Sequence, residues 1–476
     1  MRHLRYFLSA FLAEGFLAFF RLSFLWGAMG WLLSTSSVGQ YFTSTMHAHD
    51  LQRSARWAGD AALHAQPVVV LIDDAGYESF FGGQSPVSRG RMRELLKTIS
   101  ANTPASARVV LDIDLSPVAG QELDQSALEA LFLEQPTRWV LPAPKATGTK
   151  EAMAALTQWR TNLCAKGVGF GLPYVPTEFG YPLPTHQYTD GLARVATRAD
   201  LPCADPNQSA FTQVSMPLQG AMLDTGLVIP FTGDLQQLAQ MLQAVNPSMV
   251  FVGGGWGHLD LLGTPFGERY GVQVHAAAAA GATAGERMAT PLQEMLIIWL
   301  FCGLIGALRG VFYEAVDQTR MEALSVLPGH GFWRNTGRPI VFFVWVFFLV
   351  MGFSELLAMV HGETGYWVST GNVAVFTLCS VLMSWGAGRS APQEHSGFGH
   401  AWRELVLAPV VADFRSLRLA LQGLMGPVSQ TALLPQRITN LTRTEALREG
   451  LLALARLGAE TVLPLISLVY ALKELA

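Results

Sequence analysis

Four long apolar segments constrain this chain more than any other feature of its sequence. They lie within residues 6–35, 292–309, 338–357 and 366–386. A helix needs about 20 mainly apolar residues to cross a bilayer. Glu14 and Arg21 interrupt the first segment, and a charge at the bilayer centre costs at least roughly 2.5 kcal/mol, so we expect that span to start near residue 16. A cleavable signal peptide is the rival interpretation, but its apolar region would be too long and no clean small-x-small site follows. The sequence therefore predicts about four membrane spans.

Lysine and arginine residues beside these segments indicate their orientation, because positive charges collect on the cytoplasmic side. Arg2 and Arg5 precede the first span, four arginines separate the second from the third, and Arg389 follows the fourth. The connection at 361–367 has neither lysine nor arginine. We therefore expect a multi-pass protein of a bacterial inner membrane, with its main domain extracytoplasmic, or periplasmic.

Four regions follow from this topology. Residues 1–37 form an interfacial or transmembrane helix, 38–289 an extracytoplasmic domain, 290–388 three spans with a cytoplasmic loop near 310–338, and 389–476 a cytoplasmic helical tail. In the tail, residues 450–472 are apolar enough that a fifth span stays open. A helix lying on the membrane or against a partner is the preferred alternative.

Composition excludes several other classes of protein. Half of the 476 residues are hydrophobic and 14% are charged, against about 25% charged residues in ordinary soluble domains. A net charge of −4 gives no basic field that would attract nucleic acid. Four cysteines are too few for a disulfide scaffold, and no Cys-x-x-Cys pair indicates zinc. Cys164 and Cys203 both lie in the external region, where an oxidising compartment would permit a bridge, but their spacing leaves that question open.

The external region predicts an α/β fold, layered around a mostly parallel sheet. Short apolar runs, typical of buried strands, lie at Val68–Ile72, Val109–Ile113, Trp139–Leu141, Val168–Phe170, Leu227–Phe231 and Met249–Val252. Helical patterns separate several of them, at residues 89–99, 150–163 and 234–245. Alternating strands and helices favour this layered architecture. Residues 172–225 show a poorer pattern and predict a long excursion across the domain surface.

Two stretches of this region resemble the CHASE2 domain family. The segments "VVVLIDDAGYESF", "SPVSRGRMRELLKTI" and "ARVVLDIDLSP" resemble its opening, and "SMVFVGGGWGHLDLLGTPFGERYGVQVHAAAAA" resembles its closing segment. The closing features are a strand, a Gly-rich turn, an Asp, a Thr-Pro, a Gly and a His-Ala pair, here at Val252, Gly253, Gly255, Asp260, Thr264, Pro265, Gly271, His275 and Ala276. The resemblance covers roughly residues 40–388 and includes one span before the domain and three after it.

This resemblance implies a sensory or binding domain that acts through separate partners. Family members usually carry a cytoplasmic cyclase or kinase, whereas residues 388–476 hold none of the glycine-loop or catalytic-loop motifs of such modules. It implies structural turns at Gly253, Gly255, Thr264, Pro265 and Gly271. We expect no catalytic activity, no cofactor and no bound metal.

Polar residues gather where the predicted strands end, and ligands favour the carboxyl ends of strands in open α/β sheets. The candidate ligand-binding residues are Asp73, Asp74, Arg89, Asp112, Asp114, His258, Asp260 and His275. The carboxylates and histidines could together hold a divalent cation and activate water. The simpler interpretation is that Asp73 and Asp74 terminate a strand by capping backbone N–H groups. In that interpretation His275 is a core histidine of an Ala-rich helix, and Arg89 pairs with Asp73 or Asp74.

Three functions are therefore carried forward. The first is a membrane-anchored extracytoplasmic sensor or scaffold that signals to an unidentified cytoplasmic effector. The second is a structural subunit of an envelope-spanning secretion or conjugation complex, and the third is an extracytoplasmic metal-dependent hydrolase. We expect membrane lipid as a partner, together with self-association into a homo-oligomer or assembly into a membrane complex, because the tail is strongly apolar.

Overall fold

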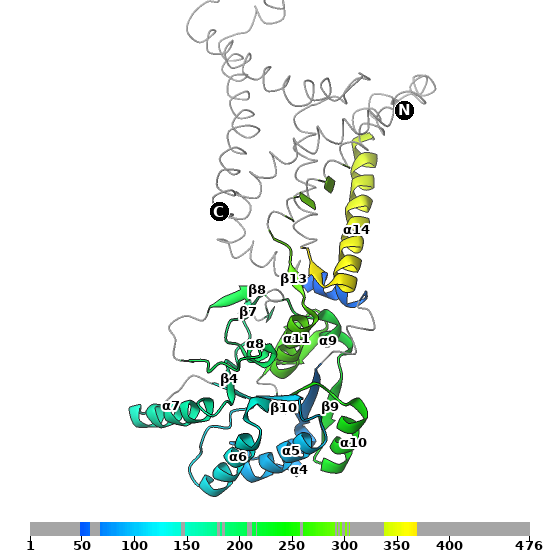
Figure 1. Cartoon of the computed structure of the whole chain (residues 1–476). Helices are drawn as coiled ribbons and strands as arrows, with labels where there is room; N and C mark the ends of the chain where they lie inside the picture. The colour runs from blue at the N-terminus through cyan, green and yellow to red at the C-terminus, as the bar shows by residue number, and fades with distance from the viewer. Residues whose placement is uncertain are drawn as a thin grey trace, which may run out of the picture. The chain divides into compact units, whose positions relative to one another are not determined.

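A computed structural model describes most of the external region and part of the region after it (Figure 1). The described residues are 48–57, 67–143, 148–178, 181–182, 186–206, 212–215, 217–257, 260–290, a few positions between 293 and 304, and 338–368. Two compact units divide the chain: Tyr41–Ala289 with Glu355–Thr370 forms one, and Thr290–Ser354 belongs to the other. Helix α14 (Arg338–Thr364) contributes to both.

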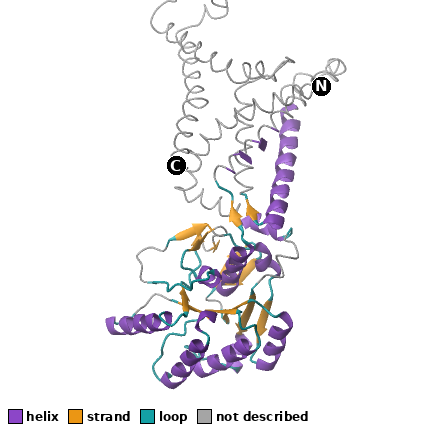
Figure 2. Ribbon diagram, in the orientation of Figure 1, coloured by secondary structure: helices purple, strands orange, loops and turns teal. Residues whose placement is uncertain are grey.

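A six-stranded parallel sheet is the centre of the first unit (Figure 2). Its strands, in spatial order, are β4 (Gly169–Gly171), β3 (Trp139–Pro142), β2 (Arg108–Asp112), β10 (Met249–Gly255), β1 (Val68–Asp73) and β9 (Val228–Phe231). The α/β class and all six predicted strands are confirmed, with ends that differ by at most a few residues. Inserting β10 between β1 and β2 brings the carboxyl ends of these three strands together.

Helices cover both faces of the sheet, which makes a three-layered domain. One face carries α4 (Asp74–Ser79), α5 (Arg89–Ala101), α6 (Glu122–Glu134) and α10 (Leu235–Val245). The other carries α8 (Leu192–Thr197), α9 (Gly220–Thr225) and α11 (Gly271–Ala284). Successive residues of a strand point to opposite faces: Val68 and Val70 join the core beside α5, and Val69 joins the core beside α11.

The predicted helices begin at side-chain caps, which satisfy backbone N–H groups that lack helical partners. Ser88 accepts a hydrogen bond from Arg91 N at the start of α5, and Thr149 accepts one from Ala152 N at the start of α7 (Lys150–Cys164). Asp234 accepts from Gln236 N and Gln237 N ahead of α10. One face of α5 is apolar and completely buried, at Met92, Leu95, Leu96 and Ile99.

Residues 172–225 are more regular than the sequence predicts. They contain two antiparallel strand pairs, β5 (Thr177–Glu178) with β6 (Tyr181–Pro182) and β7 (His186–Tyr188) with β8 (Gln213–Ser215). They also supply α8 and α9, whose apolar residues are buried against the sheet and α11. Part of this segment therefore forms a core layer and does not only cross the surface.

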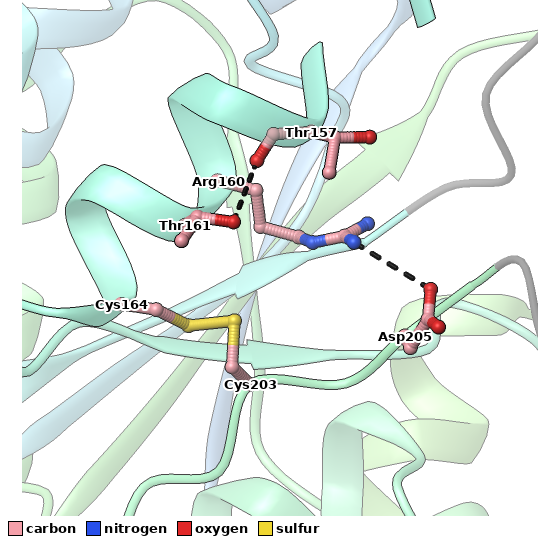
Figure 3. The surroundings of a disulfide bond; sticks show 6 residues. All are labelled: Thr157, Arg160, Thr161, Cys164, Cys203 and Asp205. Carbon is pink, nitrogen blue, oxygen red and sulfur yellow. Dashed lines mark hydrogen bonds and ion pairs between the residues drawn. A yellow bond between two sulfur atoms is a disulfide. The ribbon is translucent and has the colours of Figure 1, made fainter. Parts of the chain in front are cut away.

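The disulfide that the sequence left open is present between Cys164 and Cys203 (Figure 3). The Cα atoms of the two residues are 5.9 Å apart. Cys164 ends α7, while Cys203 lies in a segment that pairs with Phe170 of β4. Beside the disulfide, Arg160 of α7 pairs with Asp205, with Nη2 and Oδ1 3.6 Å apart. The bridge and the ion pair both tie α7 to the edge of the sheet.

The predicted spans fall mainly outside the described residues. This holds for residues 6–35 and for most of 292–309 and 366–386, and α14 coincides with the third segment. In the parts of the chain that the structure describes, no helix was found that is long and apolar enough to cross a bilayer.

Candidate functional site

The paired carboxylates that end β1 have structural partners. Asp73 Oδ1 accepts a hydrogen bond of 2.7 Å from Gly76 N and so caps α4. Asp74 Oδ1 accepts one of 3.1 Å from Gly257 N, just beyond the end of β10. The two residues therefore terminate β1 and hold the neighbouring turn, as capping predicts.

Arg89 is buried and bonded within its own layer, away from Asp73 and Asp74. Its guanidinium donates to Ser116 O at 2.7 Å, to Val87 O at 3.2 Å and to Gln125 Oε1 at 3.1 Å. Burial lowers the pKa of Arg89, and the charge of Asp114 partly opposes that effect. Asp114 itself accepts from Ser116 N. The predicted pairing with Asp73 or Asp74 is replaced by contacts to backbone carbonyls, because the side chain turns toward the loop after β2.

Asp112, His275 and Asp260 lie together at the carboxyl ends of β2 and β10, and they form what we call the acid–histidine cluster. His275 Nε2 is 4.0 Å from Asp112 Oδ1, and the side chains are 2% and 8% exposed respectively. Nε2 also lies 3.4 Å from Pro173 O. A carbonyl oxygen can only accept a hydrogen bond, so Nε2 carries the proton. Nδ1 is then left as a buried acceptor, with no hydrogen-bond partner among the described residues.

Asp260 forms the outer edge of the cluster. It is exposed, and its Oδ2 accepts a hydrogen bond of 3.1 Å from Gly271 N at the start of α11. It precedes a hairpin of β11 (Leu261–Thr264) and β12 (Gly267–Tyr270). Its contact with Gly271 places a carboxylate at the positive end of the helix dipole, which favours the charged form. The cluster therefore runs from solvent at Asp260 to a closed interior at Asp112.

Two glycines allow α11 to sit against this edge of the sheet. A Cβ on Gly253 would lie 2.4 Å from Val272 Cβ, and one on Gly271 would lie 2.6 Å from Asp260 Oδ2. The sequence predicts turns at Gly253, Gly255 and Gly271, whereas the structure places the first two inside β10 and the third at the start of α11. Their small size serves close packing here. Thr264 and Pro265 do lie at the β11–β12 turn, where Thr264 Oγ1 donates to Gly267 O.

The electrostatics of the cluster favour uncharged forms. Burial raises the pKa of Asp112 to about 7 and lowers the pKa of His275 to about 4. The pKa of Asp260 is raised to about 6, by burial and by the negative charge of Asp112. Shifted carboxyl and imidazole groups in one place are a feature of functional sites.

The described residues do not support the metal-site hypothesis. No group of three or more His, Cys, Asp or Glu residues among them is arranged to hold a metal ion. His258 lies outside the described residues, and Asp73, Asp74 and Asp114 are each bonded to a backbone N–H.

A second acid–histidine contact, which the sequence did not predict, lies at the end of α14, and we call it the α14 foot. His361 Nε2 is 3.5 Å from Glu286 Oε2, with both side chains buried. The His361 ring packs 4.7 Å from the buried ring of Trp367. Strand β13 (Arg287–Met288) pairs in parallel with β14 (Tyr366–Trp367) directly beside this contact. No spacing rule could have found a pair so far apart in the chain.

Comparison with known proteins now identifies the family. The model of the CHASE2 domain matches residues 28–308, which is more than half of the chain. The chain therefore belongs to the CHASE2 domain family. CHASE2 domains are extracellular sensory domains, which agrees with a sensory role. Searches among curated proteins and among solved structures gave no significant match.

Proposed function

We propose that this chain is a membrane-anchored extracytoplasmic sensor of a bacterial inner membrane. Its CHASE2 domain responds to a stimulus outside the cytoplasm, and separate cytoplasmic partners carry the signal onward. The chain itself catalyses no reaction in this proposal. A homo-oligomer, or a larger membrane complex, is the assembly in which it acts.

The Cys164–Cys203 disulfide supports the extracytoplasmic placement. Disulfides form and persist in oxidising compartments and are rare in a reducing cytosol. Closing a loop of 39 residues stabilises the fold by about 4 kcal/mol on the chain-entropy argument. The domain therefore carries a bond that suits the periplasm.

Membrane attachment is supported by the pattern of apolar segments and of arginines beside them. In α14, three large apolar side chains are half or more exposed: Val344 at 50%, Phe347 at 58% and Phe348 at 67%. Such a row of apolar groups indicates contact with lipid or with another apolar surface.

Helix α11 is the observation that carries the sensor proposal. Its first turns hold His275 against Asp112, and it ends at Ala284, two residues before Glu286. At 1.5 Å per residue, about 14 Å separates His275 from the last helical residue, Ala284. Ten of its positions, including Val272, Val274 and Ala276–Ala280, are buried, which makes α11 a rigid element. A change at the cluster therefore has a short mechanical route to the residue that contacts α14.

Accessibility labelling tests this proposal. Leu123, which is 88% exposed in α6, and Ser429 in the tail are each changed to cysteine in full-length protein that also carries Cys302→Ser and Cys379→Ser. We expect a membrane-impermeant maleimide to label Leu123→Cys in intact spheroplasts and to label Ser429→Cys only after permeabilisation. Labelling of both positions from the same side would overturn the proposed topology.

A further inference from the structure

The acid–histidine cluster contains more acidic than basic groups. Asp112 from β2 and Asp260 from the turn before β11 face a single imidazole, His275 from α11. Strand β10 contributes only Gly253 beside Asp112, and the segment before β5 contributes the Pro173 carbonyl. In the described part of the chain no lysine or arginine pairs with any of the three, and Asp114 acts on Arg89 instead. Two carboxylates without a cationic partner favour uptake of protons.

The inside of the cluster is closed to anything large. The side chains of Asp112 and His275 are almost completely buried, and Gly253 and Gly271 bring backbone into contact around them. The described residues also offer no arrangement that would hold a metal ion. A proton is the ligand that such a site can take without opening.

An exchange route and a vacant acceptor are both present. Asp260 is exposed and interacts electrostatically with both Asp112 and His275, so it can pass protons between solvent and the interior. His275 Nδ1 is a buried acceptor atom that has no hydrogen-bond partner in the described residues. An unpaired buried acceptor is costly. A proton added to the cluster turns one of its acceptors into a donor and so changes the hydrogen bonds that the cluster can make.

We propose that Asp112, His275 and Asp260 form a proton-binding site, and that its protonation is the stimulus that this domain senses. The inference rests on the proposed sensor function and names its ligand. Deprotonation of Asp112 places a second negative charge beside Asp260 under the first turn of α11. In this proposal α11 then shifts its position against β10. The shift moves the C-terminal end of the helix, and with it Glu286, relative to α14.

Infrared spectroscopy of the full-length protein in lipid nanodiscs tests proton binding directly. A protonated carboxyl group has a C=O stretch that a carboxylate lacks, and the band shifts in D₂O. We expect such a band at about pH 5 and its loss around pH 7, where burial puts the pKa of Asp112. Asp112→Asn should remove the part of this band that titrates around pH 7 and leave the part from Asp260, which titrates around pH 6. Asp114→Asn, a matched change at an exposed carboxylate two residues along, should leave it in place.

The wild-type titration is decisive on its own, so the proposal does not depend on how well Asp112→Asn folds. A wild-type spectrum without a carboxyl band that disappears between about pH 5 and about pH 8 would overturn it, as would a band that persists unchanged in folded Asp112→Asn. Neither result would affect the topology that accessibility labelling measures. A sensor with another stimulus would then be left, and the two proposals can fail separately.

Discussion

The two ends of α11 hold two acid–histidine contacts that differ in how they balance charge. At the α14 foot, one carboxylate meets one imidazole, Glu286 with His361 at 3.5 Å. In the acid–histidine cluster, two carboxylates share one imidazole, and the nearest pair is 4.0 Å apart. Both contacts are buried, so a difference in exposure to solvent does not explain how they differ.

This difference indicates that the two contacts have different roles. A one-to-one buried pair holds two segments together, and it is costly to break because the remaining polar group stays buried without its partner. A cluster with an excess of acid must bind protons to stay buried, so its charge depends on pH. We therefore interpret the α14 foot as a fixed attachment. The charge of the acid–histidine cluster varies with pH, and α11 lies between the two contacts.

Breaking the fixed attachment should have the largest effect. His361→Ala leaves Glu286 buried without its partner and removes the ring that packs on Trp367. We expect a loss of about 3 kcal/mol in the free energy of unfolding, measured by denaturant unfolding of the full chain in detergent. Glu363→Ala, at an exposed position of the same helix, should cost less than about 0.5 kcal/mol. Equal losses in the two variants would show that the α14 foot carries no special stability.

Removing the variable charge should give a pH-dependent gain. The pKa of Asp112 is raised from 3.8 to about 7 in the folded domain, so folding takes up a proton in that window and stability falls as the pH rises. The slope is about 1.4 kcal/mol per pH unit for one proton. Asp112→Asn lacks this dependence, so from about pH 5 to about pH 7 it should gain roughly 2 kcal/mol on the wild type.

Unfolding curves of Asp112→Asn and Asp114→Asn at several pH values check this expectation. The Asp114 variant should follow the wild-type curve, since that carboxylate is exposed. A constant difference between Asp112→Asn and wild type at every pH would contradict a raised pKa at Asp112.

Changing the histidine of the cluster should give a smaller effect of opposite sign. The pKa of His275 is lowered from 6.5 to about 4, so unfolding takes up a proton in that window and stability falls as the pH falls. His275→Gln removes this acid sensitivity, and we expect it to gain about 1 kcal/mol on the wild type between about pH 6 and about pH 5. The same unfolding curves measure it. A variant that became more acid-sensitive than the wild type would show that His275 is charged in the folded domain.

The smallest effect is expected at the rim of the sheet. Asp74 is exposed and holds one backbone N–H, so Asp74→Asn should change the free energy of unfolding by less than about 0.5 kcal/mol at any pH. A pH-dependent change as large as that of Asp112→Asn would extend the proton-binding site to the end of β1.

Much of the fold could be predicted from the sequence, because the six strands are short runs of large apolar residues and the helices carry clear caps. The sequence also names Asp112, Asp260 and His275 as candidates, through the ends of predicted strands and a family resemblance, and the structure brings the three together. Ligand binding by these residues stays a prediction. The Gly253–Gly255 run was misleading. A glycine run predicts a turn locally, whereas here the sheet uses it to admit Val272 and Leu71.

Other parts of the site depend on tertiary contacts that local patterns do not encode. The sequence predicts that Arg89 meets a carboxylate, whereas its guanidinium donates to Ser116 O, in a loop that starts more than 20 residues later, and to Val87 O. Glu286 and His361 are 75 residues apart and meet through the pairing of β13 with β14. This contact could be predicted only by knowing that the segment after α14 pairs with β13 of the domain.

Hydrogen exchange at the α14 foot tests most directly whether α11 joins the two ends. Arg287 N donates to Gly365 O and Ala289 N donates to Trp367 O, so these amides report on the pairing of β13 with β14. After correction for intrinsic rates, we predict that their protection in the full chain changes between about pH 5.5 and about pH 7.5, and that Asp112→Asn abolishes this change. Protection that is the same at both pH values, or that changes equally in wild type and Asp112→Asn, would contradict the account.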